Sequence, residues 1–258
     1  MASILVTGAA GFLGRALVPR LRAEGWKILA PDLRREPLPA RADAVVHLAQ
    51  SPGKTPAMWK ASAGLTKDLL AWAPGAGVRT FLLASSGSAL GPRSGQARPG
   101  LALEDDLPAP ADAYGLAKLA AEAAVLHSGL ERALVVRLYT LFGPGQGPER
   151  LVPRLEAAVR EGRPVEVAAP DGIRLTPTHV DDAAEGLLRC LACPDAAGIL
   201  HLAGPEALTV GEMARRLGAS PRIVPRPPRR GEGDLAGDAS RLAAVTGWRP
   251  SKRFGGLR

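Results

Sequence analysis

Apolar and polar positions alternate in blocks along this chain, and the blocks predict its fold. Short apolar runs stand at residues 4–7, 26–30, 44–49, 79–84 and 133–138, and tracts with helical spacing separate them. Nearly continuous apolar strands with helices between them are typical of a parallel sheet that is covered on both faces. The pattern therefore predicts an α/β fold. In such a sheet, ligands bind beyond the carboxyl ends of the strands.

A glycine-rich turn follows the first apolar run. Gly8, Gly11 and Gly14 let the backbone approach a pyrophosphate closely, and the N-terminus of the next helix would face its negative charge. Asp32 stands eighteen residues after Gly14, about where a carboxylate accepts hydrogen bonds from an adenosine ribose. The turn and the acid predict a Rossmann-type, doubly wound dinucleotide-binding fold.

The residues around Asp32 leave two cofactors open. Asp32 favours NAD, whereas a guanidinium of Arg34 or Arg35 would hold the 2′-phosphate of NADP. Leu33 lies between these side chains and belongs to the same predicted ribose site. The alternative is that Asp32 is only a turn or cap residue after Pro31. We expect NAD, with NADP as the second choice.

Tyr114 and Lys118 lie four residues apart in a tract rich in Ala and Leu that contains no Pro. In a helix, positions i and i+4 project from one face about one turn apart. An ammonium there favours the phenolate and lowers the tyrosine pKa from about 10 toward neutrality, as proton exchange with an alcohol requires. Alone, such a pair would be a solvated phenol and a solvated amine. The glycine-rich turn favours the catalytic interpretation.

A series of ordered motifs extends this interpretation over nearly the whole chain. They stand at residues 7–14, 45–49, 85–91, 114–118, 137–146, 179–183 and 238–250. With these motifs the chain resembles the extended short-chain dehydrogenase/reductases, and within them the NAD-dependent epimerase/dehydratase group. From this resemblance we expect an enzyme that uses NAD and catalyses a reaction of this family.

The resemblance also implies a role for each residue of the site. Tyr114 would be the general acid/base, Lys118 would bind the nicotinamide ribose and tune Tyr114, and Ser86 would hydrogen-bond the reacting oxygen. Outside the family, Ser86 would be only a polar residue in a Ser/Gly turn. The expected cofactor-binding residues are Gly8, Gly11, Phe12, Leu13, Gly14, Asp32, Leu33, Arg34, Leu48, Ala49, Ser85, Tyr114, Lys118 and Tyr139.

Departures from the family pattern bear on the reaction. Dehydratases of this family carry an acidic pair directly after the serine position, where this chain has Gly87 and Ser88. Epimerases that act beside a keto group use an extra Cys or a His/Lys couple in this loop, but the only cysteines are Cys190 and Cys193. What remains is removal of a hydride from a carbinol and its return to the opposite face, or a one-way oxidation or reduction.

The second half of the chain is expected to bind the substrate. The predicted organisation is a dinucleotide-binding domain over residues 1–150 and a smaller substrate-binding lobe over 151–258, of which about 173–204 return to the first domain. Arg174 and Arg230 are candidates to bind the diphosphate of a nucleotide sugar, because a guanidinium binds it bidentately. A solvated basic loop is the alternative.

Further departures affect the substrate and the adenine pocket. Ala61 and Thr140 stand where the family usually has Asn, and the second Asn commonly contacts a nucleotide-sugar phosphate, so Thr140 is a substrate-binding candidate. Ala44 stands only twelve positions after Asp32. The usual third strand and its helix should therefore be missing or vestigial, which leaves the adenine pocket open on one side.

Composition excludes several classes of function. A chain of 258 residues without an 18-residue apolar run, entering a strand at once, indicates a cytoplasmic protein outside the membrane. The net charge is +8, but the basic residues are scattered and aromatic residues make up 4%, which argues against a nucleic-acid partner. Two cysteines cannot complete a zinc site, and no metal is expected.

Three functional hypotheses follow. The first is a redox-neutral nucleotide-sugar epimerase of the 4-epimerase type that keeps its NAD bound. The second is an NAD(P)-dependent dehydrogenase or reductase of a sugar, a uronate or another small carbonyl compound. The third is a non-catalytic NAD(P)-binding sensor, which the Ser86, Tyr114 and Lys118 set argues against. By resemblance alone, a homodimer is expected.

Overall fold

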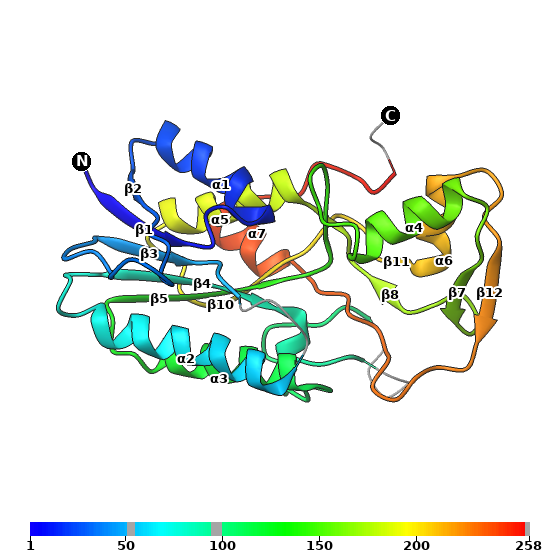
Figure 1. Ribbon diagram of the computed structural model, residues 1–258, viewed down its shortest axis with the longest axis horizontal. Coiled ribbons are helices and arrows are strands. Elements are labelled where there is room, and N and C mark those ends of the chain that lie inside the picture. The colour runs from blue at the N-terminus through cyan, green and yellow to red at the C-terminus, as the bar shows by residue number, and fades with distance from the viewer. Residues whose placement is uncertain (51–54, 94–99, 256–258) are drawn as a thin grey trace.

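The computed structural model describes residues 1–50, 55–93 and 100–255. At its centre is a six-stranded sheet in which all neighbouring strands are parallel, in the order β10-β5-β4-β3-β1-β2 (Figure 1). The strands are β1 (Ser3–Thr7), β2 (Lys27–Leu29), β3 (Ala44–His47), β4 (Thr80–Ser86), β5 (Arg132–Leu138) and β10 (Gly198–Leu202). The expected α/β fold with a doubly wound, Rossmann-type parallel sheet is confirmed.

Helices cover both faces of this sheet (Figure 1). One face carries α1 (Phe12–Ala23), α5 (Val180–Ala192) and α7 (Ser240–Thr246), and the other carries α2 (Pro56–Trp72) and α3 (Ala113–Leu126). Each face has its own apolar core, the first around Leu17 and Leu187 and the second around Leu69 and Phe81. The strands read as continuous apolar runs because both of their faces are buried.

The connection between β2 and β3 has no strand or helix of its own, as the short gap between Asp32 and Ala44 predicts. Residues 30–43 contain neither a strand nor a helix. Leu33 and Leu38 pack against the second core instead, and Trp72 Nε1 of α2 donates a hydrogen bond to the Pro39 carbonyl (3.0 Å). Strand β2 is therefore the edge strand on this side. The sheet ends one strand earlier here than in a complete doubly wound sheet.

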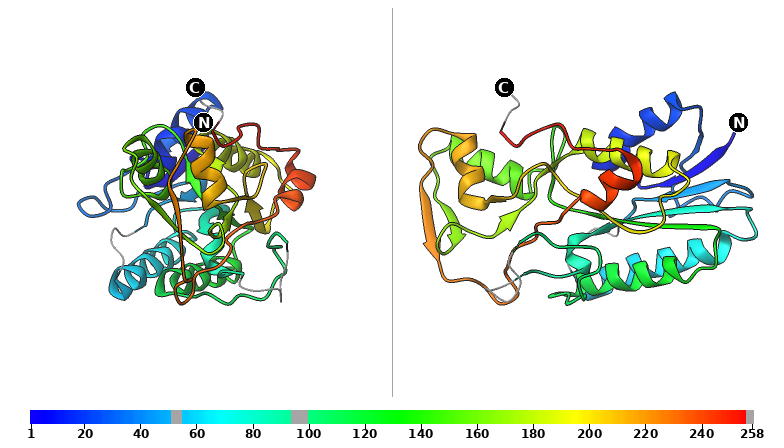
Figure 2. Two further views of the ribbon diagram at one scale, coloured as in Figure 1. Left: turned by 90° about the vertical axis from the view of Figure 1, so that its right-hand side faces the viewer. Right: turned by 180° about the vertical axis from the view of Figure 1, so that it is seen from behind.

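A smaller lobe lies at one end of the sheet (Figures 1 and 2). It contains α4 (Leu151–Arg160), α6 (Val210–Leu217), a parallel pair of β7 (Val165–Ala168) with β12 (Ile223–Arg226), and an antiparallel pair of β8 (Arg174–Leu175) with β11 (Leu208–Thr209). Its core is separate and includes Val152, Leu155 and Met213. The lobe is thus built around its own apolar centre.

The chain passes between the lobe and the sheet more than once. After β8 it runs through β9 (Thr178–His179), which pairs with β6 (Leu141–Phe142), into α5 and β10 of the sheet layer. A second return follows β12, where bridges join Arg93 to Asp234 and Ala102 to Gly237 before α7. Sequence reasoning did not anticipate this second return, because it lies in a Pro/Gly-rich stretch without periodicity.

In the part of the chain that the structure describes, no helix combines the length and the apolarity that crossing a membrane would require.

Candidate active site

The glycine-rich turn between β1 and α1 has the tight backbone that its sequence predicts. Gly8 has a φ of +72°, and a Cβ there would lie 2.8 Å from the main-chain nitrogen of Ala49. A Cβ on Gly14 would lie 2.3 Å from the Gly8 carbonyl oxygen, so helix α1 packs directly on the turn. Gly11 is the N-cap of α1, and none of the described side chains caps this helix end. The free backbone N–H groups in the first turn of α1, beginning with that of Phe12, therefore fit the pyrophosphate of a dinucleotide.

Two buried side chains hold the loop after β3 beside this turn. Thr7 Oγ1 accepts a hydrogen bond from the N–H of Ala49 (3.1 Å) and lies 2.6 Å from His47 Nδ1. His47 Nε2 lies 3.1 Å from Thr66 Oγ1 of α2. Burial lowers the pKa of His47 to about 3, so its imidazole is neutral. This network fixes the main chain of Leu48 and Ala49, the predicted cofactor contacts, in place.

Tyr114 and Lys118 lie on the first turns of α3, on one helix face, as their spacing predicts. The carboxylate of Asp112 caps this helix. Lys118 Nζ donates to the Ala84 carbonyl of β4 (3.0 Å) and lies 5.9 Å from the centroid of the Tyr114 ring. Ser86, the last residue of β4, is close enough to the Tyr114 side chain to lower its pKa. The structure therefore brings the three predicted catalytic residues together.

The electrostatics of this set differ from the expectation in one respect. Burial raises the pKa of Tyr114 above its usual value, although the nearby Ser86 side chain and the charge of Arg150 lower it. Lys118 is itself buried, which lowers its pKa to about 8. The expectation that Lys118 brings the Tyr114 pKa toward neutrality is corrected: within the protein, desolvation of the phenol is the largest effect.

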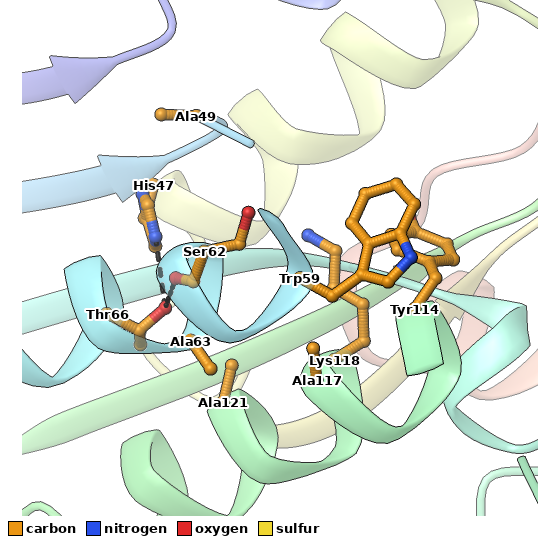
Figure 3. A pocket seen from close by; sticks show the side chains of 10 residues that line it. All are labelled: His47, Ala49, Trp59, Ser62, Ala63, Thr66, Tyr114, Ala117, Lys118 and Ala121. Atoms are coloured by element: carbon orange, nitrogen blue, oxygen red, sulfur yellow. Dashed lines mark hydrogen bonds between the residues drawn. The ribbon is translucent and has the colours of Figure 1, made fainter. Parts of the chain in front are cut away.

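A pocket opens between α2 and α3 beside this pair (Figure 3). Trp59 of α2 lies against Tyr114, with ring centroids 4.8 Å apart and planes inclined by 52°. Short side chains line most of the remaining wall, which comprises His47, Ala49, Ser62, Ala63, Thr66, Ala117, Lys118 and Ala121. Sequence reasoning missed Trp59, because nothing in its local pattern distinguishes it from other apolar residues of a helix.

Ser85 points away from the predicted cofactor site. Its hydroxyl is hydrogen-bonded to Glu122 Oε1, and Glu122 forms a buried ion pair with Arg137 (2.8 Å). Ser85 is buried, so a contact with a cofactor could involve only its main chain. Glu122 lies four residues after Lys118 on α3, and this continued spacing was a signal that sequence reasoning could have used.

Tyr139 is also buried, at 2% exposure. Its ring lies between Gly87 and Gly237, where a Cβ would come within 2.4 and 2.3 Å of ring atoms, and its hydroxyl lies 3.3 Å from His201 Nδ1. The expected contact between this side chain and a nicotinamide is therefore corrected to a packing role. Tyr139 also explains Gly87, because a side chain at that position would collide with the ring.

The predicted ribose site lies on an exposed turn after β2. Asp32 Oδ1 accepts a hydrogen bond from the Arg34 N–H (3.2 Å), and Asp32 Oδ2 lies 3.9 Å from Arg35 Nε. Asp32 is therefore a turn residue as well as a candidate ribose ligand. Leu33 packs against the core beneath, whereas Arg34 is exposed.

The substrate-binding candidates stand around the junction of the lobe and the sheet. Arg174 is exposed in β8, and its N–H donates to Asp234 Oδ1 (2.7 Å). Arg230 is exposed, and a Cβ on the next residue, Gly231, would lie 3.2 Å from Ala111 Cβ just before α3. Thr140, which follows β5, has a φ of +20°. All three candidates are thus close to segments that lead into the site.

His179 has a structural role at the start of α5. Its Nδ1 accepts a hydrogen bond from the Asp181 N–H at the start of α5 (3.2 Å), so it caps that helix.

The fold and the site together have the form of an extended short-chain dehydrogenase/reductase: a parallel sheet, a glycine-rich turn under a helix N-terminus, and a Ser-Tyr-Lys set at the carboxyl edge. The chain belongs to the NAD dependent epimerase/dehydratase family, whose sequence model matches residues 4–203. No curated protein matches the chain.

Solved structures share this fold over nearly their full length. MoeE5, in complex with UDP-glucuronic acid and NAD, is 29% identical and has a TM-score of 0.84, with 98% of this chain and 95% of that chain covered. RMD from Pseudomonas aeruginosa, complexed with NADPH, is 26% identical with a TM-score of 0.82 over 99% and 95%. The UDP-glucose 4-epimerase from Thermus thermophilus, in complex with NAD, is 24% identical with a TM-score of 0.79 over 98% and 95%, and supports the fold alone.

Proposed function

We propose that this protein is an NAD-dependent nucleotide-sugar epimerase of the 4-epimerase type. The observation that carries the proposal is the assembly of Ser86, Tyr114 and Lys118 at the carboxyl edge of the sheet. The similarity to MoeE5, crystallised with UDP-glucuronic acid and NAD, supports a uridine-diphosphate sugar as substrate and NAD as cofactor.

The residues of this set suit reversible oxidation of a sugar hydroxyl. In its ionised form the Tyr114 side chain would accept the hydroxyl proton and later return it, while Ser86 donates a hydrogen bond to the same oxygen. Lys118, whose ammonium lies 5.9 Å from the centroid of the Tyr114 ring, would bind the nicotinamide ribose, as the resemblance implies. Bound NAD supplies a reversible acceptor for the hydrogen on the same carbon. Epimerisation then requires only that the sugar present its other face.

The loop after β4 supports epimerisation over dehydration. Elimination of water needs a second acid and base beside the reacting carbon, and Gly87 and Ser88 supply neither. The ring of Tyr139 fills the space that a side chain at position 87 would need, so an acidic residue could not be accommodated there. We therefore assign the Ser86, Tyr114 and Lys118 set to hydride transfer alone.

The diphosphate and the second subunit are further parts of the proposal. We assign the diphosphate to Arg230 and Arg174, with Thr140 beside it, because both arginines are exposed and a guanidinium suits bidentate binding. A homodimer through α2 and α3, which lie on one face of the sheet, is proposed from the resemblance. Light scattering of the purified protein tests it directly.

A dehydrogenase or reductase is the second candidate. The short 30–43 connection favours it, because a cofactor with less protein around its adenine would exchange more readily. RMD, the neighbour complexed with NADPH, is consistent with this candidate.

The cofactor content of the natively purified protein separates the two candidates. The protein would be denatured and the released nicotinamide nucleotide identified and quantified. Near-stoichiometric NAD is expected for an epimerase that recycles its cofactor, and turnover of uridine-diphosphate sugars would then be screened. A protein that carries no nucleotide but binds added NAD or NADP reversibly would contradict the epimerase proposal and favour the second candidate.

A further inference from the structure

Trp59 is the one large apolar side chain in the wall of the pocket beside Tyr114, within the described residues. It stands in the first turns of α2, whose start is fixed by Thr55: the Thr55 carbonyl accepts the Trp59 N–H (3.2 Å). The two helices otherwise meet at this pocket through small residues such as Ala63 and Ala117. The indole therefore stands out by its size among the side chains of this pocket.

The contacts of Trp59 suggest a role for this residue (Figure 3). Its ring lies against Tyr114 at 4.8 Å, and the side chain of Ser86 is close to that of the same tyrosine. Lys118, next to both aromatic residues, is 8% exposed. An indole in this place limits how far the phenol can turn, and it forms part of the wall of the pocket that Lys118 also lines.

We propose that Trp59 is a positioning residue of the active site: its indole holds the phenol of Tyr114 toward Ser86 and keeps water from Lys118. This inference rests on the proposed function, because it gives Tyr114 and Lys118 the roles assigned above.

The exclusion of water has a measurable effect on Lys118. Its pKa of about 8 is caused mainly by burial, and the nearby carboxylate of Glu122 acts in the opposite direction. The other groups that face Lys118 are neutral His47 from β3, the Tyr114 phenol from α3 and the Ala84 carbonyl from β4. None of these groups changes when Trp59 is replaced. A change in the pKa of Lys118 would therefore report hydration of the ammonium.

The test is a pH titration of Lys118 by NMR in protein labelled with ¹³C at the lysine ε-carbons. The chain has only six lysines, and Lys118→Arg identifies the signal. The variants are Trp59→Ala, the conservative Trp59→Phe, and a matched control, Trp72→Phe, on the far end of the same helix. Trp59→Gln serves as a second variant, because glutamine would admit water to the pocket while its side chain stays longer than that of alanine.

We expect Lys118 to titrate near pH 8 in the wild type, Trp59→Phe and Trp72→Phe. In Trp59→Ala and Trp59→Gln the midpoint should rise by about one pH unit or more, because hydration favours the ammonium. An unchanged titration midpoint of Lys118 in both Trp59→Ala and Trp59→Gln would overturn the proposal.

Turnover gives a second readout once a substrate is known. Trp59→Ala should lower kcat about tenfold or more with little change in KM, and Trp59→Phe should restore it. Equal effects on kcat and KM, without rescue by Phe, would contradict a positioning role. The NMR titration needs no substrate, so failure of the proposed function, seen as no turnover even in the wild type, is distinguishable from failure of this inference.

Discussion

Tyr114 occupies an environment that favours the protonated form of its phenol. Burial raises its pKa, and the groups that lower it are a hydroxyl, Ser86, and a cation, Arg150. Arg150 stands at the N-cap of α4, at the entrance to the lobe. The proton-transfer group therefore depends on the substrate lobe as well as on its own helix, which sequence spacing did not indicate.

Asp32 provides the first prediction at this scale. Asp32→Ala should weaken NAD at least about tenfold and NADP much less, because a carboxylate accepts hydrogen bonds from the ribose hydroxyls but repels a 2′-phosphate. Titration of both cofactors by calorimetry measures the difference.

The matched control is Glu36→Ala, an exposed carboxylate of the same turn that accepts a weak hydrogen bond from the Asp32 N–H (3.5 Å). It should leave the ratio of the two affinities unchanged. Equal losses of NAD and NADP in Asp32→Ala would leave Asp32 with only its turn role.

Among the elements, α3 joins the catalytic pair to the core. Tyr114, Lys118 and Glu122 follow one another at intervals of four residues, and Glu122 binds both Ser85 and Arg137. The ion pair thus connects α3 to the ends of β4 and β5, next to Ser86.

Glu122→Gln should lower the free energy of unfolding by about 3–5 kcal/mol, because it leaves the Arg137 charge buried without its partner. Urea denaturation measures this change. The double variant Glu122→Leu with Arg137→Met should recover most of the loss, since it removes both charges. A single variant as stable as the wild type would contradict the buried pair.

The short helix η1 (Gly87–Ala89) after β4 is constrained by Tyr139. Gly87→Ala should lower the free energy of unfolding by about 1–3 kcal/mol, because its Cβ would lie 2.4 Å from Tyr139 Cε1. Thermal and urea unfolding provide the measurement.

Gly64→Ala is the control for Gly87→Ala. It lies within α2, and a Cβ there meets no atom within 4 Å. This variant should be neutral or more stable by up to about 1 kcal/mol. If the two alanine variants behaved alike, the close approach of Tyr139 to Gly87 would be wrong.

For the whole molecule, the apolar runs predicted the parallel sheet, the spacing of three glycines predicted the tight turn, and the short gap after Asp32, compared with the family pattern, predicted the missing third strand. These features are local: an apolar run is a buried strand, and twelve positions are too few for another strand and helix. The grouping of Ser86 with Tyr114 and Lys118 was implied by the resemblance to the family, whereas helical spacing alone placed Tyr114 and Lys118 on one face.

What the sequence left open depends on contacts between distant elements. The burial of Tyr139 between Gly87 and Gly237 involves three segments, and the Trp59 contact joins two helices. No local pattern reports such contacts. For the same reason, the bonding of Ser85 to Glu122 could not be read from the strand that carries it.

Buried histidines predict how stability depends on pH. Burial lowers the pKa of His47 to about 3 and that of His201 to about 4. In the unfolded chain both titrate near 6.5, so below this pH the unfolded state takes up protons that the folded state does not. The free energy of unfolding should therefore fall as pH drops from about 6.5 to 4, by up to about 1.4 kcal/mol per pH unit for each histidine.

Urea titrations at several pH values measure this slope. His47→Gln removes one of the buried histidines and should make this slope smaller over the same range. A slope that is flat between pH 6.5 and 4 in the wild type would contradict neutral, buried imidazoles.

The central claim is reversible hydride transfer at a sugar carbon with Tyr114 as the proton-transfer group. Proton NMR of UDP-glucuronic acid and UDP-glucose, incubated with the wild type and with Tyr114→Phe in the presence of NAD, tests it directly. We expect the C4 epimer of one sugar to form with the wild type and at least about 100-fold more slowly with Tyr114→Phe, which should bind NAD as well as the wild type. A Tyr114→Phe variant as active as the wild type, or a wild type that forms no epimer of either sugar, would contradict the account.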